Sequence, residues 1–376
     1  MAIKKAKAEH HPGLIILIVL FALLGIGTIM IYSSSAIYAL KNWGNTSHFL
    51  IKQIFNLAIG LVALRISLKV DYKVYQKLVP FLMVSTFVLL LLILIPGIGT
   101  EVGNARRWIR IFGFGFQPSE LLKFTLITWL ASFLGRKKEL LGLFSQSLLP
   151  VLTVLGVFFF LLLLQPDFGT AVLISITLLA MIFVAGARLS HLFLSLSGIG
   201  GLAFLLIISK SYRMRRITGF LDPWADPLDT GFQLIQSFIA FSTGGVFGLG
   251  LGNSRQKLFF LPEAHTDFIL AILAEEAGLI GVIVVLGLLV TLMVKGFEIA
   301  GHCQEDFGKS LAFGITMLIS LQSFLNFGVV MGLLPTKGIP LPFISYGGSS
   351  LVINMFMVGV LVNIARYNDR QDAKGQ

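Results

Sequence analysis

The sequence has little charge and almost no cysteine. Only 12% of its 376 residues are charged and 56% are hydrophobic, whereas soluble domains carry about 25% charged residues. An ordinary soluble domain is therefore excluded, and an integral membrane protein is predicted. The single cysteine, Cys303, cannot form an intrachain disulfide and gives no basis for a metal–thiolate site.

Several common catalytic signatures are also missing. The chain has no Walker loop, no dinucleotide fingerprint, no HExxH pair and no nucleophile elbow. It has no low-complexity linker either, so residues 1–376 are predicted to form a single membrane domain. The net charge of +11 is dispersed among apolar runs. This distribution argues against nucleic acid and favours anionic lipid headgroups or anionic lipid-linked substrates.

Long apolar runs dominate what is present. A helix needs roughly 20 apolar residues to cross a bilayer, and by this measure the chain is an all-α, polytopic membrane protein with about ten transmembrane helices. The first run is longer than the core of a cleaved signal and is predicted to remain as the first helix. The predicted spans are residues 14–32, 49–66, 78–96, 118–135, 145–164, 169–187, 192–209, 267–294, 310–334 and 343–365.

An even number of spans places both termini on the same side of the membrane. The excess of Lys and Arg in the corresponding loops assigns that side to the cytoplasm. Residues 1–13 are then a cytoplasmic N-terminal segment and residues 366–376 a cytoplasmic tail. The longest connection, residues 210–266 between the seventh and eighth spans, becomes a large extracytoplasmic loop. Its apolar, glycine-rich second half predicts a segment that lies on the membrane or re-enters it.

Three groups of basic residues fall on the outer side, where the topology rule does not favour them. Singly, they could be long side chains that snorkel at the interface. Together they favour an outward-facing site for an anion such as a diphosphate, because arginine presents a planar fork to phosphate oxygens. The candidates from these groups are Arg106, Arg107, Arg213, Arg255 and Lys257.

Three carboxylates occur at the start of the eighth span, in LPEAHTDFILAILAEEAG (261–278). Asp267 lies where loop becomes helix, so it could cap the helix or act as a partly desolvated base that faces an outer cavity. Glu275 and Glu276 lie roughly 12 Å deeper on a helix, too far to form one acid–base pair with Asp267. At least one of them is predicted to face the bundle interior in a structural role.

Other polar groups interrupt the apolar runs. Glu120 and Lys123, spaced i, i+3 in QPSELLK, could form a local ion pair or line the outer cavity. Asp167 in QPDFGT could cap the helix that follows it. The glycine-rich SYGGSS could form a phosphate-binding nest or only a tight start to the last span; its candidates are Ser345, Gly347 and Gly348.

Six segments of this sequence occur together, in this order, in one known family. They are ARRWI (105–109), QPSELLK (117–123), QPDFGT (165–170), GFQLIQSFIAFSTGGVFGLGLG (231–252), LPEAHTDFILAILAEEAG (261–278) and GLLPTKGIPLPFISYGGSSL (332–351). On these segments the chain resembles the SEDS family (shape, elongation, division and sporulation), to which RodA, FtsW and SpoVE belong. The resemblance covers most of residues 14–365 and implies a fold of ten helices.

The resemblance implies peptidoglycan glycosyltransferase activity, in which lipid II is polymerised into glycan strands on the outer face of the bacterial cytoplasmic membrane. It implies that Asp267, in HTDF, is the catalytic residue, that Trp108 is functionally sensitive, and that Lys123 is the lysine of the QPSE motif. It also implies lipid II and a nascent glycan strand as binding partners. A class B penicillin-binding protein, acting as transpeptidase, and other division proteins are the implied protein partners.

The branch of the family is indicated by residues 336–338, Thr-Lys-Gly. This tripeptide resembles the division or sporulation branch more than the elongation branch, which favours cell-wall synthesis at the division septum. Lys337 joins the candidates for binding the diphosphate. Phe232 stands where the family commonly has tyrosine and Phe168 where it commonly has leucine, and neither departure touches the expected chemistry.

The expected reaction transfers the growing glycan from undecaprenyl diphosphate to a hydroxyl of lipid II. Asp267 would accept the proton of that hydroxyl as a general base, and the outer basic residues would stabilise the leaving diphosphate. A divalent cation, Mg²⁺ or Mn²⁺, could share the second task, although the sequence has no dedicated ligand cluster.

Two other functions are compatible with the same features. A flippase that carries lipid II across the bilayer would need a continuous polar path through the midplane, formed by Glu275, Glu276, Glu120 and Asp167. A scaffold would only recruit partners at the division site. Because the basic groups fall on the outer loops, the enzyme is favoured over both.

Overall fold

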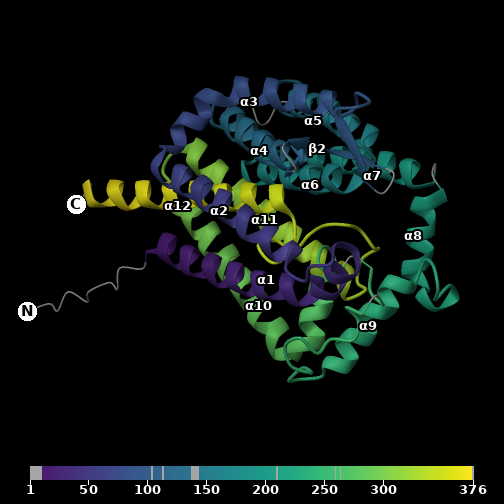
Figure 1. The fold of residues 1–376 in the computed structure, drawn as a ribbon. Coiled ribbons are helices and arrows are strands. Elements are labelled where there is room, and N and C mark those ends of the chain that lie inside the picture. The colour runs from purple at the N-terminus through teal and green to yellow at the C-terminus, as the bar shows by residue number, and fades with distance from the viewer. Residues whose placement is uncertain are drawn as a thin grey trace, which may run out of the picture.

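The computed structural model describes residues 11–102, 105–111, 114–136, 144–208, 211–258, 260–262 and 264–374. This part of the chain is largely helical, with one small sheet (Figure 1). The helices are α1 (Pro12–Trp43), α2 (His48–Lys69), α3 (Tyr72–Leu92), α4 (Pro118–Arg136), α5 (Phe144–Leu164), α6 (Phe168–Val184), α7 (Leu189–Ile208), α8 (Ser211–Leu221), α9 (Phe232–Gly244), α10 (Ile269–His302), α11 (Asp306–Val330) and α12 (Gly348–Lys374), with a 3-10 turn at Pro223–Ala225. The strands are β1 (Gly99–Val102), β2 (Ala105–Ile111) and β3 (Phe114–Phe116).

The predicted all-α membrane fold is confirmed. Each of the ten predicted apolar ranges coincides with one helix, α1 to α7 or α10 to α12. In the described part of the chain, six helices are long and apolar enough to cross a membrane, namely α1, α2, α3, α10, α11 and α12. The number of helices that actually span the bilayer stays a prediction.

Packing sorts the helices into an enclosed centre and a lipid-facing periphery. Most of α11 and α12 is buried, whereas most of α2 and α3 is not. Exposed apolar side chains on the outer helices, such as Val62 on α2 and Phe81 on α3, suit contact with acyl chains. Helices α2 and α12 approach closely at Gly60. A Cβ at this position would lie 2.4 Å from the Met355 sulfur, so glycine, which has no Cβ, fits there without displacing the methionine.

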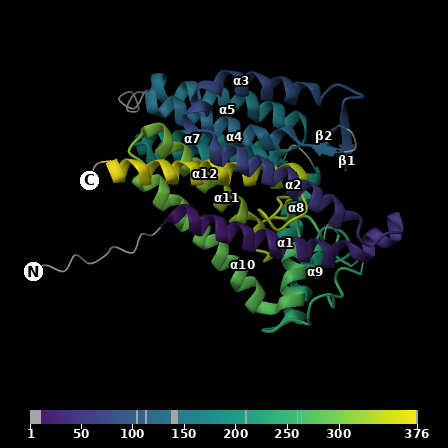
Figure 2. The same cartoon turned by 60° about the vertical axis from the view of Figure 1, so that its left-hand side comes forward.

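A three-stranded antiparallel sheet forms where the sequence predicted only a loop. Its order is β1-β2-β3, with Thr100 opposite Trp108 and Arg110 opposite Gly115. The segment contains aromatic and β-branched side chains, such as Trp108 and Ile109, which favour strands. The sheet lies at the end of the bundle opposite the two termini (Figure 2), and β2 carries the basic pair and the tryptophan of ARRWI.

The second half of the long loop folds back onto a break in α10. The break is at Gly278, whose φ of 66° and ψ of −166° leave the helical region. Loop and helix exchange backbone hydrogen bonds on both sides of it: Leu249 N donates to Glu275 O at 2.9 Å, and Leu279 N donates to Gly245 O at 3.0 Å. Non-helical backbone is tolerated at membrane depth only where such bonds satisfy it. The segment therefore packs against α10 within the protein, and its position relative to the membrane stays a prediction.

At the end of the bundle that carries the termini, the carboxylate of Glu305 connects three segments of the chain by hydrogen bonds. Glu305, in the turn between α10 and α11, accepts hydrogen bonds from Tyr72 at 2.9 Å, Lys73 at 2.5 Å and Tyr367 at 2.8 Å. The donors come from α3 and α12, so the residue ties three segments of the chain together.

A Glu305→Gln variant is expected to be less stable at pH 7, by up to about 1 kcal/mol because the group is partly exposed. Burial alone would raise the pKa of Glu305, but hydrogen bonds from Lys73, Tyr367 and Tyr72 lower it below its ordinary value. A carboxyl with a depressed pKa stabilises the fold above its unfolded pKa and loses that contribution as the pH falls through its folded pKa. Thermal unfolding at pH 7 and pH 4 should therefore show a difference from wild type that narrows in acid. Equal melting at pH 7 would contradict this role.

Candidate functional site

A cavity of about 230 Å³ lies among the helix ends on the side of the sheet. Its walls come from β2, the first turns of α4 and α6, the segment before α10, helix α11 and the loop between α11 and α12. The lining residues are Arg107, Trp108, Gln117, Glu120, Lys123, Asp167, Thr170, Leu173, Thr266, Asp267, Gln322, Gly338, Ile339, Pro340 and Tyr346. Six of the candidates from the sequence are thus brought together: Asp267, Arg107, Trp108, Lys123, Glu120 and Asp167.

Asp267 is half-buried and is held by backbone contacts on two sides. The Nδ2 of Asn326, on α11, donates to Asp267 O and to Ile339 O, both at 2.8 Å. A Cβ at Gly338 would lie 2.6 Å from Asp267 Oδ2, so the loop closes directly against the carboxylate. The N-cap position of α10 is occupied by Phe268, which makes no side-chain cap hydrogen bond. Asp267 therefore precedes the cap and lines the cavity.

Lys123 and Glu120 form both the local ion pair and the cavity wall that the sequence left as alternatives. Lys123 is 3% exposed, and its Nζ lies 2.8 Å from Glu120 Oε1. It also donates to Gln322 Oε1 at 3.2 Å, and Gln322 Nε2 donates to Pro340 O at 2.9 Å. The charge of Lys123 is thus largely balanced within the protein, and this chain of bonds connects α4 to the loop across the cavity.

Arg107 and Asp167 meet at the start of α6. Arg107 Nε donates to Gln165 O at 3.1 Å, and a second guanidinium nitrogen donates to Pro166 O. Asp167 Oδ1 accepts from Thr170 N at 3.4 Å, so it caps α6 as the sequence allowed. Because carbonyl oxygens rather than carboxylates hold Arg107, its positive charge is not cancelled there and is available to an anion.

Lys337 lies beside this group, in the loop after α11. Its Nζ is 4.9 Å from the centroid of the Phe168 ring, and its Cε would lie 2.4 Å from a Cβ at Gly169. Burial lowers the pKa of Lys337 to about 8; nearby Asp167 opposes that shift, while Arg216 and Arg107 add to it. The loop therefore brings further positive charge towards the wall formed by Arg107.

The other arginine candidates lie outside the cavity lining. Arg106 points its Nε towards Glu101 Oε2 at 3.2 Å within the sheet. Arg255 is exposed, and its backbone makes two hydrogen bonds: its N–H donates to Glu275 Oε1 at 3.0 Å, and its carbonyl accepts from Leu258 N at 3.0 Å. Arg213 belongs to α8, and its side chain lies outside the described part of the structure.

The segment around Lys257 is bonded to the two glutamates of α10, and the Lys257 side chain itself pairs with Glu276. It is 6% exposed, and its Nζ lies 2.7 Å from Glu276 Oε1 and 3.1 Å from Ser33 Oγ. The Glu275 carboxylate accepts from the backbone of residues 255 and 256 and from Ser254 Oγ. These carboxylates hold the returning loop against α10 and α1, a structural role of the kind predicted for at least one of them. The structure gives Lys257 a buried carboxylate partner rather than a place in the cavity.

In the glycine-rich segment SYGGSS, Tyr346 lines the cavity, whereas the three candidates Ser345, Gly347 and Gly348 do not. Ser345 is 4% exposed, and its Oγ accepts from Leu341 N at 2.8 Å. Gly348 begins α12, and a Cβ there would lie 2.8 Å from Asn56. Gly347 uses its carbonyl to accept from Leu351 N at 2.8 Å. The segment forms a tight start to the helix, the second of the two alternatives.

Several polar residues of the site were not singled out from the sequence. These are Gln117, Thr170, Gln322, Asn326 and Tyr346. Gln322 and Asn326 lie one turn apart on α11 inside an apolar range. Polar side chains within such a range usually face the bundle interior and mark functional sites. Gln322 and Asn326 could therefore have been identified as candidate site residues from the sequence.

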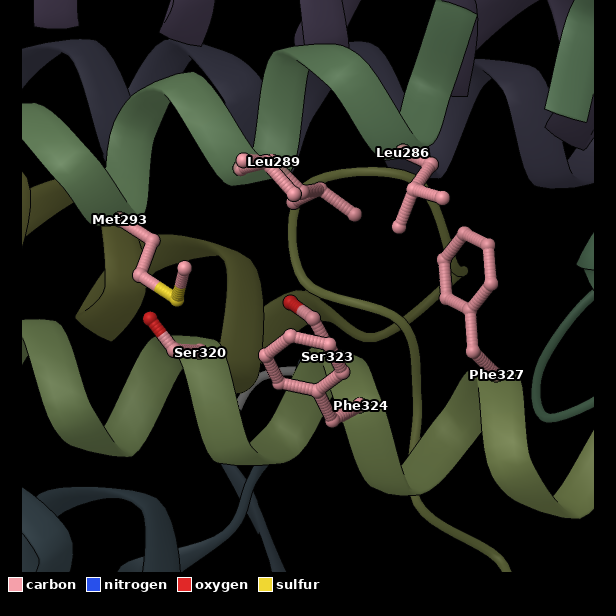
Figure 3. A pocket seen from close by; sticks show the side chains of 8 residues that line it. Leu286, Leu289, Met293, Ser320, Ser323, Phe324 and Phe327 are labelled. Atoms are coloured by element: carbon pink, nitrogen blue, oxygen red, sulfur yellow. The ribbon is translucent and has the colours of Figure 1, made fainter. Parts of the chain in front are cut away.

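A narrower crevice of about 10 Å³ lies between α10 and α11 (Figure 3). Its lining is apolar apart from the hydroxyls of Ser320 and Ser323, and it contains no titratable side chain. It therefore has no group for acid–base chemistry, and the larger cavity is the candidate active site.

The cavity does not contain a metal site built by protein ligands. In the ranges that the structure describes, no three His, Cys, Asp or Glu side chains are grouped to hold a metal ion, and Glu120 is already paired with Lys123. Mg²⁺ is commonly held by one or two carboxylates together with substrate phosphates. Asp167 at the cavity wall fits that arrangement only in combination with diphosphate oxygens.

Comparisons with known proteins agree on one family. The model of the FtsW/RodA/SpoVE family, described as "Cell cycle protein", matches residues 14–370. A "Probable peptidoglycan glycosyltransferase FtsW" of Geobacter sp. (strain M18) is 46% identical over 353 residues, which cover 94% of this chain and 96% of that protein. "Stage V sporulation protein E" of Bacillus subtilis (strain 168) is 44% identical over 361 residues, covering 96% and 98%.

Solved structures share the same architecture. One, described as "Structural coordination of polymerization and crosslinking by a peptidoglycan synthase complex", has a TM-score of 0.77 at 29% identity and covers 94% of this chain and 97% of its own. The crystal structure of the rod shape determining protein RodA of Thermus thermophilus has a TM-score of 0.70 at 25% identity, covering 93% and 95%. With the family match spanning residues 14–370, the chain belongs to the FtsW/RodA/SpoVE family of cell cycle proteins.

Proposed function

We propose that this protein is a peptidoglycan glycosyltransferase that polymerises lipid II into glycan strands at the outer face of the bacterial cytoplasmic membrane. The observation behind this assignment is that Asp267 shares one cavity with Arg107, whose charge is held by carbonyl oxygens and not by a carboxylate. A carboxylate and a positive charge in one cavity are what a transfer from a diphosphate requires. Relatives that align over nearly the whole chain carry the name of this activity.

In the proposed reaction, the 4-hydroxyl of the GlcNAc of lipid II attacks the anomeric carbon of the growing glycan. The new glycosidic C–O bond forms as the bond from that carbon to the diphosphate oxygen breaks. Asp267 accepts the hydroxyl proton, and undecaprenyl diphosphate leaves with the electron pair of the broken bond. A general base must lie within hydrogen-bond reach of the proton that it accepts. The hydrogen bond from Asn326 to Asp267 O and the close approach of Gly338 fix the position of the Asp267 segment.

The leaving diphosphate gathers negative charge, and the cations at the start of α6 are placed to stabilise it. Nε and one terminal nitrogen of Arg107 donate to carbonyl oxygens, and the remaining N–H groups of its guanidinium can donate to the diphosphate. Lys337, whose pKa burial lowers to about 8, would be held in its charged form by an arriving diphosphate. A Mg²⁺ or Mn²⁺ ion held by Asp167 and the diphosphate would supply additional neutralising charge.

The position of the acidic residues favours an enzyme over a flippase. A flippase would need Glu275 and Glu276 to continue a polar path from Glu120 and Asp167. Only Glu120 and Asp167 are among the residues that line the described cavity, whereas Glu275 and Glu276 are bonded to the loop at residues 254–257. The acidic residues therefore do not form one continuous polar path in the described structure: two line the cavity, and the other two are bonded to the returning loop.

We further propose that the protein acts in septal wall synthesis, with both termini in the cytoplasm and a class B penicillin-binding protein as transpeptidase partner. The Thr-Lys-Gly tripeptide at 336–338 supports the division or sporulation branch, as do relatives named FtsW and stage V sporulation protein E. The similar structure of a peptidoglycan synthase complex, described as coordinating polymerization and crosslinking, supports such a partnership.

The test is lipid II polymerisation by the purified protein, alone and with a class B partner. Glycan strands should form, and strand length should be resolved by electrophoresis. Transport should be measured in parallel, as the exposure of labelled lipid II on the opposite face of vesicles. Strands without transport are the expected result. Transport without strands, even with the partner present, would overturn the enzyme and establish the flippase.

A further inference from the structure

The cavity is too small to hold the polymer that the proposed function makes. Its volume is about 230 Å³, below the roughly 300–1,000 Å³ of pockets that enclose a drug-sized ligand. If the glycosyltransferase assignment holds, the cavity encloses only the groups next to the reacting bond. The rest of the growing saccharide must lie on the surface next to the cavity, so a second contact surface is needed there.

A continuous cluster of aromatic rings leads from the cavity wall to the surface. Its members are Tyr38, Trp43, His48, Phe49, His265 and Tyr346. Tyr346 lines the cavity, and the centroid of its ring lies 5.1 Å from that of Phe49. His265, two residues before Asp267, lies 4.6 Å from Phe49 and 5.6 Å from Tyr38.

The outer end of this cluster is exposed and firmly held. Tyr38 is 38% exposed and Trp43 is 48% exposed, and their ring planes stand at 63° with centroids 5.8 Å apart. Trp43 is the last residue of α1. Its ring stacks on His48 of α2 at 4.7 Å and 10°, and Gly44 closes the helix with a φ of 68° and a bond to Leu40 O. The two exposed rings therefore have a fixed orientation.

We propose that Tyr38 and Trp43 form a stacking platform for the saccharide chain that leaves the cavity. The faces of aromatic rings are electron-rich, and the C–H groups on the flat side of a pyranose ring carry slight positive charge, so the two stack. Rings set at an angle offer two separate faces to successive sugars. The platform is uncharged, so it binds the strand without competing with Arg107 and Lys337 for the diphosphate.

Anchoring at the membrane interface is the alternative role for Tyr38 and Trp43. Tyr and Trp collect at membrane–water interfaces as anchors, without any ligand. What separates Tyr38 and Trp43 from such anchors is their ring-to-ring continuity with Tyr346 of the cavity wall. Two other exposed rings lack these contacts in the described structure and serve as matched controls: Tyr32, 42% exposed on α1, and Trp224, 64% exposed in the long loop.

The test compares a Tyr38→Ala/Trp43→Ala variant with a Tyr32→Ala/Trp224→Ala variant. The probe is a lipid-free, uncrosslinked octasaccharide of alternating GlcNAc and MurNAc, and its Kd is measured by titration calorimetry with the purified protein. We expect the platform variant to bind it at least tenfold more weakly than wild type and to make shorter strands from lipid II. The control variant should match wild type in both measurements, and Trp43→Phe, which keeps a ring, should recover most of the binding that Trp43→Ala loses.

Equal binding and equal strand length in the two double variants would overturn the platform and leave Tyr38 and Trp43 as membrane anchors. The octasaccharide carries no lipid and no diphosphate, so its binding is measured independently of catalysis. Failure of the platform is thereby separate from failure of the glycosyltransferase assignment, which is judged by whether wild type makes strands at all.

Discussion

An Asp267→Asn variant is expected to bind lipid II and to make no measurable glycan strands. The substitution keeps the size of the side chain and removes the proton acceptor, and general-base catalysis typically contributes about 10²–10⁴-fold to a rate. Binding should persist because the backbone of residue 267, not its carboxylate, accepts the hydrogen bond from Asn326. Lipid II binding and strand synthesis should be measured on the same preparation, with the transpeptidase partner present.

The matched control is Asp229→Asn, which makes the same chemical change in the long loop. The Asp229 carboxylate is 64% exposed and pairs with Arg215, and neither residue lines the described cavity. This variant should polymerise lipid II at the wild-type rate. If Asp267→Asn retains the rate of Asp229→Asn, the carboxylate of Asp267 is not the base, and another group in the cavity must accept the proton.

The ten helices of the apolar ranges could be predicted because each one is recorded locally in the sequence, whereas α8 and α9 fall in the stretch predicted as a loop. An apolar run of sufficient length has no other stable form in a bilayer, where every backbone group must be bonded within the segment. The ranges 118–135 and 145–164 accordingly match α4 (Pro118–Arg136) and α5 (Phe144–Leu164) almost to the residue. The clustering of Asp267 with Lys123 and Arg107 followed from placing their segments on the same side of the membrane.

The three strands lie between Gly99 and Phe116 and pair only with their sequence neighbours, so their strand-favouring residues were a local signal that the loop prediction did not use. The break in α10 could not be predicted in the same way as the apolar helices, because it depends on contacts with a distant segment. In the sequence, Gly278 is one more small residue in an apolar run. Its non-helical backbone is stabilised by hydrogen bonds between residues 245–250 and α10, which the sequence pattern does not show. Likewise, Lys257 reads as a loop cation available to a diphosphate. Its pairing with Glu276 requires the loop to fold back, which no local pattern encodes.

That pairing makes Lys257→Met the substitution with the largest expected effect on stability. Lys257 is 6% exposed and Glu276 is 1% exposed, so removing the ammonium leaves a buried carboxylate whose remaining donors are Ser33 Oγ and the backbone of residue 254. Breaking a buried ion pair by removing one partner costs about 3–5 kcal/mol. The variant should unfold at markedly lower temperature or denaturant concentration than wild type in the same detergent.

A double variant distinguishes the stability lost with the ion pair from the stability lost with the packing of the Lys257 side chain. In Lys257→Met/Glu276→Gln the buried charge is gone, and replacing both partners of a buried pair is often close to neutral, so much of the stability should return. Lys295→Met removes the ammonium from a partly exposed pair with Glu298 and should cost no more than about 1 kcal/mol. If Lys257→Met and Lys295→Met cost the same, or the double variant recovers nothing, the ion pair is not what fastens the returning loop to α10. Because the loop leads through residues 258–266 into Asp267, a confirmed loss would also predict weaker catalysis in a variant whose cavity residues are all intact.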